Sequence, residues 1–146
     1  MKKLLCSLCL LSLLSATFNS CKKSSDEEEE EPEECELSVA SIAGTYKLVV
    51  AKRVEASGEI DVTNQLYDAC ELDDLNELKA DGTFKYTDAG TSCGGPATFT
   101  GTWLVNGRVL KINSGFANIE SFNCRDLVIT YRDDAGNLIK ETNRRQ

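Results

Sequence analysis

From Gly44 onward, apolar and polar residues alternate along the chain with a period of two. Phe84 and Tyr86, for example, alternate with Thr83, Lys85 and Thr87. Alternation of this kind is typical of strands that place one face on a hydrophobic core. The pattern predicts about eight or nine short strands, at residues 44–53, 59–63, 75–79, 83–87, 97–105, 108–112, 119–123, 127–132 and 138–142.

Turn signals separate these segments. Asp81-Gly82 and Asn106-Gly107 suit two-residue hairpins, because both central residues of a type I′ turn have positive φ. Tight turns make sequential strands pair, so we predict an all-β fold, a small antiparallel up-and-down barrel of about eight strands. Residues 35–43 and 66–73 lack alternation and are expected to form helical turns, the first plugging one end of the barrel. An immunoglobulin-like sandwich is the rival fold, but the hairpins are too consecutive for a Greek key.

The first 20 residues have the features of an export signal. Two lysines precede an apolar run from Leu4 to Leu14, which is too short to span a bilayer as a helix. Cys21 directly follows Ser20, and this arrangement resembles a bacterial lipobox, in which the cysteine is lipidated and becomes the new N-terminus. We predict a signal peptide at 1–20 and a membrane anchor at Cys21. The alternative is ordinary signal cleavage nearby that leaves Cys21 as a free thiol.

An acidic tether is predicted at residues 21–36. Residues 22–36 hold nine acids and two lysines (net −7), whereas residues 37–146 hold 15 acids and 12 bases (net −3). A block of like charges repels itself and stays extended, so we expect the tether to be disordered and the folded domain to span 37–146. Acidic residues close to a lipidated cysteine resemble a signal that sends lipoproteins to the outer cell surface. The expected location is therefore the cell envelope, on the outer membrane and surface-exposed.

The composition excludes several functions. A net charge of −8 argues against a nucleic-acid partner, and the lack of histidine removes His-dependent nucleophiles and imidazole metal sites. After processing, four of the seven cysteines remain, and an even number in an exported domain implies disulfides, with three possible pairings. These four are Cys35, Cys70, Cys93 and Cys124. They form no Cys-x-x-Cys motif, so we expect no metal site, and nothing indicates a cofactor or an enzyme.

Several short motifs occur in a characteristic order: Gly44-Thr45-Tyr46, then Cys70 to Asp74, Leu78 to Phe84, and Gly101-Thr102-Trp103 followed by Asn106-Gly107. This series resembles the small lipocalin-like domain of many bacterial lipoproteins, with Tyr46 where lipocalins carry the tryptophan of Gly-x-Trp. The resemblance implies a lipocalin-like barrel in which Cys70 pairs with Cys93 and Cys35 pairs with Cys124.

The function expected from these features is that of a surface-anchored, non-enzymatic binding module for a small apolar ligand. Tyr46 and Trp103 are the candidate ligand-binding residues, although core packing is the simpler role for both. We expect a mostly filled interior with a shallow cup at one end, near residues 66–73 and 88–97. The alternative function is a protein-interaction module, either an inhibitor or an accessory subunit of a surface complex, that uses the barrel rim.

Two pairs of adjacent charged residues favour structural roles. Asp73-Asp74 could form a pair of acid–base carboxylates or a calcium corner, but such a pair more often lies in a solvated turn, and that is the expectation here. Arg144-Arg145 is expected to be a frayed C-terminal end.

Overall fold

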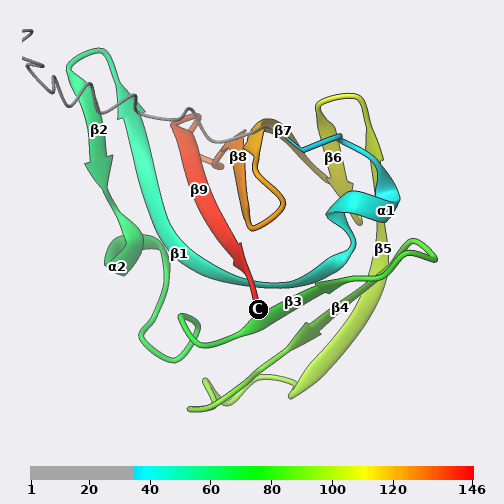
Figure 1. Cartoon of the computed structure of the whole chain (residues 1–146). Coiled ribbons are helices and arrows are strands. Elements are labelled where there is room, and N and C mark those ends of the chain that lie inside the picture. The colour runs from blue at the N-terminus through cyan, green and yellow to red at the C-terminus, as the bar shows by residue number, and fades with distance from the viewer. Residues whose placement is uncertain (1–34) are drawn as a thin grey trace, which may run out of the picture.

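The computed structural model describes residues 35–146 (Figure 1). The predicted signal peptide, Cys21 and the tether up to residue 34 lie outside the described residues. Within them the chain forms two short helices and nine strands. These are α1 (Val39–Ile42), β1 (Gly44–Glu55), β2 (Gly58–Asp61), α2 (Thr63–Leu66), β3 (Leu75–Leu78), β4 (Thr83–Thr87), β5 (Thr98–Asn106), β6 (Val109–Ile112), β7 (Gly115–Phe122), β8 (Asp126–Arg132) and β9 (Leu138–Arg145).

Eight strands close into an antiparallel ring. β1 pairs with β3 near its start and with β9 over most of its length, and β3 to β9 pair in sequence order. A register shift between Leu48 and Val50 bends β1 where it follows β9 around the barrel. The predicted all-β barrel is confirmed, and a single closed ring excludes a two-sheet sandwich.

β2 is the exception to sequential pairing. It pairs only with the far end of β1, from Lys52 to Glu55, and lies outside the ring. The expectation that all consecutive strands are neighbours is therefore wrong for β2 and β3. All four residues of β2 are exposed, so this strand has no apolar face to bury in the barrel.

The second helical turn begins earlier than predicted. α2 starts at Thr63, which the alternation assigned to a strand. The Asp61 side chain accepts a hydrogen bond from the Thr63 amide (2.9 Å), and this bond ends the strand and begins the helical turn. Hairpins form at both predicted positions, with Gly82 and Gly107 at φ 84° and 56°. The expected type I′ geometry is wrong, because Asp81 and Asn106 are not among the residues with positive φ. No helix among residues 35–146 is long and apolar enough to cross a membrane.

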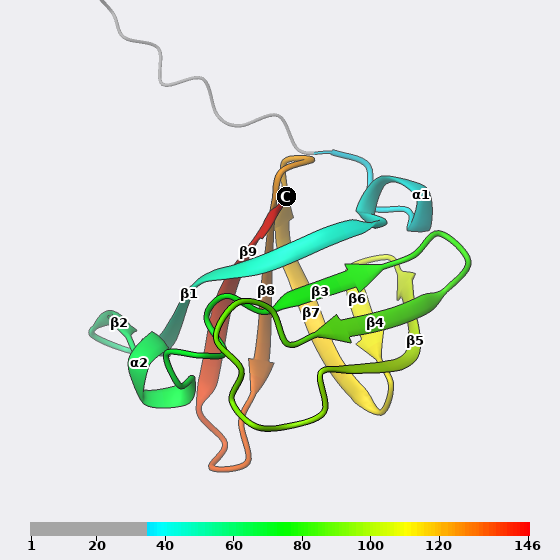
Figure 2. The same cartoon turned by 90° about the horizontal axis from the view of Figure 1, so that it is seen from below.

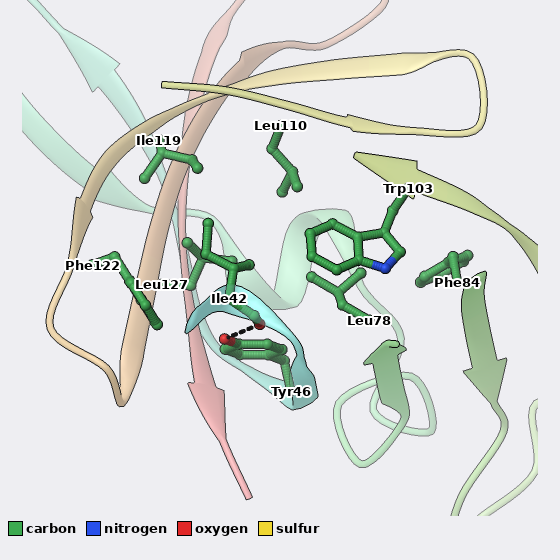
Figure 3. Packing of buried hydrophobic residues seen from close by; sticks show 9 residues of the cluster. All are labelled: Ile42, Tyr46, Leu78, Phe84, Trp103, Leu110, Ile119, Phe122 and Leu127. Atoms are coloured by element: carbon green, nitrogen blue, oxygen red, sulfur yellow. Dashed lines mark hydrogen bonds between the residues drawn. The ribbon is translucent and has the colours of Figure 1, made fainter. Parts of the chain in front are cut away.

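One half of the barrel is filled by the hydrophobic core (Figure 3). Ile42 of α1 is fully buried, so the first helical turn plugs this end, as predicted. The Tyr46 hydroxyl donates a hydrogen bond to the Ile42 carbonyl (2.7 Å), and Ser38 and Ser41 cap the helix reciprocally. The core cluster consists of Ile42, Tyr46, Leu78, Phe84, Trp103, Leu110, Ile119, Phe122 and Leu127.

The C-terminus is part of this closed end, so the expectation of a frayed end is wrong. The Arg145 guanidinium donates hydrogen bonds to the Ser41 carbonyl and to the Tyr46 hydroxyl (2.9 Å), and it stacks over the Tyr46 and Phe122 rings. Gly44 makes room for it, because a Cβ at that position would lie 2.8 Å from Arg145 Nε. Charge-assisted bonds of this kind fix a terminal strand that the alternation pattern leaves undefined.

Two disulfides join Cys35 to Cys124 and Cys70 to Cys93. This is the pairing that the family resemblance implies. The first lies at the closed end, where the Cys35 amide also donates to the Phe122 carbonyl (2.7 Å). The second connects the segment after α2 to the long loop between β4 and β5, at the opposite end (Figure 2).

Candidate ligand-binding cavity

The half of the barrel opposite α1 is hollow. It holds three adjoining cavities of about 310, 190 and 100 Å³. The prediction of a mostly filled interior therefore holds only for the closed half. In the open half, Gly115 and Ala117 face the largest cavity, and side chains this small leave the space beside β7 empty.

The largest cavity has an apolar wall. β6 contributes Leu110 and Ile112, and β8 contributes Ile129. Phe116 stands at the mouth with 64% of its surface exposed, and Lys111 lies over its ring at 5.1 Å. An exposed aromatic ring beside a cavity is a surface on which an apolar ligand can pack.

Glu141 lies where the three cavities meet, because it lines all of them. It stands on β9 opposite Ala51 and Ile129, with only 7% of its surface exposed. Its Oε1 accepts hydrogen bonds from the Tyr131 hydroxyl (2.6 Å) and the Tyr67 hydroxyl. Burial, together with the neighbouring Glu141 carboxylate, raises the pKa of both tyrosines, so both remain protonated donors at neutral pH.

A second buried carboxylate, Asp74, lines the 190 Å³ cavity. It accepts hydrogen bonds from the Tyr86 hydroxyl and from the Ala89 amide (3.0 Å). The bond to Asp74, and then burial, raise the pKa of Tyr86 to about 12. The expectation of a solvated turn is therefore wrong for Asp74. The Asp74 carboxylate is buried because it connects the β4–β5 loop to the turn before β3 through these hydrogen bonds.

Asp73 and the second disulfide strengthen the same attachment. Asp73 accepts a hydrogen bond from the Thr91 amide (3.0 Å), and the Cys70–Cys93 bridge lies alongside. These contacts hold the long loop against the segment that contributes Tyr67 and Glu71 to the cavity wall. The hydrogen bonds and the disulfide therefore hold the rim of the open end in place.

The two ligand-binding candidates predicted from the sequence, Tyr46 and Trp103, have different surroundings in the structure. Tyr46 lines the 100 Å³ cavity, at the boundary between the core and the hollow half. Trp103 is buried in the core, where its Nε1 donates to the Lys79 carbonyl (2.7 Å), and it lines none of the three cavities. The expected cup near residues 66–73 exists, since Tyr67 and Glu71 line it, whereas no residue of 88–97 lines a cavity.

Sequence reasoning missed Glu141 and Tyr67. The signal for Glu141 was present, because alternation from the buried Ile139 places it on the inward face of β9. No periodic pattern marks Tyr67, which follows α2 in an irregular segment.

A small closed antiparallel barrel, plugged by a helical turn at one end and hollow at the other, defines a lipocalin-like protein. The sequence model of the lipocalin-like domain family matches residues 42–137, and the chain belongs to this family. Neither a curated protein nor a solved structure gives a significant match. The matched region ends just before β9, so Glu141 lies beyond it.

Proposed function

We propose that this domain is a non-enzymatic binding module that takes a small, largely apolar ligand into the open half of the barrel. The observation that carries the proposal is the 310 Å³ cavity with its apolar wall. Small-molecule sites are typically concave, mostly apolar and about 300–1,000 Å³ in volume, with a few polar groups. The alternative, a protein-interaction module at the rim, would not need a hollow interior.

Filling the cavity tests this proposal. Ala117→Trp places an indole in the largest cavity, and Ala135→Trp makes the same change on the exposed β8–β9 loop as a control. We expect the neutral fluorescent probe N-phenyl-1-naphthylamine to bind the unaltered protein, and Ala117→Trp to weaken binding at least about tenfold. The control should bind like the unaltered protein. No saturable binding, or equal binding by both variants, would contradict a ligand site in the barrel.

We further propose that the domain is displayed on the outer membrane, surface-exposed, through a lipid on Cys21. The support is the export signal with Ser20-Cys21 and the acidic run that follows. Two or three acyl chains would anchor the protein stably. Cys21→Ala should move it from the membrane pellet to the soluble fraction, whereas retention in the pellet would place the anchor elsewhere.

A further inference from the structure

We propose that the ligand carries a cationic nitrogen and that the Glu141 carboxylate is its counter-ion, an inference that rests on the proposed function. Glu141 is the one residue that lines all three cavities among residues 35–146. Its Oε1 takes both tyrosine hydrogen bonds, while its Oε2 accepts none from the described residues. One carboxylate oxygen is therefore held in place and the other is available to a ligand.

The charged side chains that line the three cavities are all acidic, and Lys111 lies outside them, over the Phe116 ring at the mouth. Glu71, Asp74 and Glu141 line them, and no lysine or arginine does so within the described part of the chain. The basic residues of β9 are engaged elsewhere. Lys140 pairs with Glu59 and Glu120 outside the barrel, Arg144 pairs with Asp126, and Arg145 is held at the closed end.

A buried carboxylate without a basic partner is costly for a folded domain, because it loses hydration without a compensating opposite charge. An ammonium group that enters the cavity supplies that charge. An anionic ligand would instead meet three carboxylates, since like charges at close range repel. The charge pattern therefore selects against acids such as fatty acids.

The aromatic groups favour the same ligand class. Tyr67 and Tyr131 line the 310 Å³ cavity together with Glu141, whereas the Phe116 ring at the mouth already lies under Lys111. Aromatic faces attract cations, and a desolvated site strengthens this attraction. Both tyrosine hydroxyls donate to Glu141 Oε1, and these bonds hold the carboxylate beside the two rings. The apolar wall suits the hydrocarbon part of an alkyl or aryl amine.

Three probes that share an octyl chain but differ in head group test the inference: octylammonium, 1-octanol and octanoate. Each is titrated calorimetrically into the full domain at neutral pH. We expect octylammonium to bind at least about tenfold more tightly than 1-octanol, and octanoate to bind most weakly. Glu141→Gln keeps a hydrogen-bond acceptor for the tyrosines but removes the charge, so it should abolish the preference for octylammonium. Glu120→Gln makes the same change on the outer surface and should leave the preference intact.

The outcomes separate the two proposals. Equal binding of all three probes, or a preference for octylammonium that survives Glu141→Gln, would overturn the cationic ligand while leaving the apolar site in place. Failure of N-phenyl-1-naphthylamine and of every octyl probe to bind would overturn both. The thermal midpoint of the Glu141→Gln variant tests whether the buried carboxylate without a basic partner is costly. Without ligand, this variant should be at least as stable as the unaltered protein. The head-group comparison on the unaltered protein stands even where that variant folds poorly.

Discussion

Replacement of Arg145 by alanine tests whether the C-terminal residues close the barrel. The substitution removes the bonds from the guanidinium to the Ser41 carbonyl and the Tyr46 hydroxyl, together with its contacts to the Tyr46 and Phe122 rings (5.5 and 5.4 Å). A hydrogen bond to a charged group contributes about 1.5–3 kcal/mol, and a cation–π contact contributes about 0.5–1 kcal/mol. Fixing the arginine side chain costs about 2 kcal/mol. With two hydrogen bonds and two ring contacts, the lower ends of these ranges leave a net loss of at least about 2 kcal/mol of the free energy of unfolding.

Arg144→Ala is the matched control. Its guanidinium forms two hydrogen bonds to Asp126 on the outside of the barrel (2.8 and 3.0 Å), and an exposed pair of this kind is worth about 1 kcal/mol or less. Urea unfolding and thermal unfolding, each followed by Trp103 fluorescence, measure both variants. Arg145→Ala should lower the thermal midpoint by about 10 °C, and Arg144→Ala by only a few degrees. Equal small effects would show that the C-terminus is not part of the core and would refute the reasoning.

Two further predictions concern the crosslinks and the tyrosines. Because disulfide stabilisation grows with loop length in the chain-entropy model, loss of Cys35–Cys124 (separation 89) should cost about 4–5 kcal/mol, and loss of Cys70–Cys93 (separation 23) about 3 kcal/mol. Double alanine variants in urea measure this, and the reverse order would contradict the model. All four tyrosines have a raised pKa, three mainly through burial and Tyr86 mainly through its bond to Asp74. Below pH 10 their contribution to stability is complete, and it is lost as the pH rises through the folded-state pKa values. The folded protein should show little phenolate absorbance at 295 nm near pH 10, whereas the urea-unfolded chain should titrate there.

The strands were predictable because their signals are local. Alternation assigns each side chain to one face, and glycine at positive φ fixes the hairpins at Gly82 and Gly107. Alternation does not say how far along the barrel axis an inward residue lies. Leu110 belongs to the core cluster and also lines the largest cavity, whereas Ala117, its direct partner in the register of β6 and β7, lines the cavity without belonging to the core cluster. Only the closed structure shows that the core ends here. The pairing of β3 with the start of β1, which leaves β2 outside the ring, and the contacts of Arg145 at the closed end join distant segments, which no window of sequence contains.

The position of the first disulfide bears on how the cavity is presented. The described chain begins at Cys35, which is bonded to Cys124 at the closed end, and the cavities lie in the opposite half of the barrel. With Cys21 lipidated as proposed, the connection to the membrane enters beside α1, so the mouth lined by Phe116 and Tyr67 faces away from it. Deletion of residues 26–34 brings the closed end nearer to the lipid without covering the mouth. The affinity of the membrane-bound protein for N-phenyl-1-naphthylamine should therefore stay within about twofold of its original value. A large loss of affinity after this deletion, with the soluble form unaffected, would show that the mouth faces the membrane.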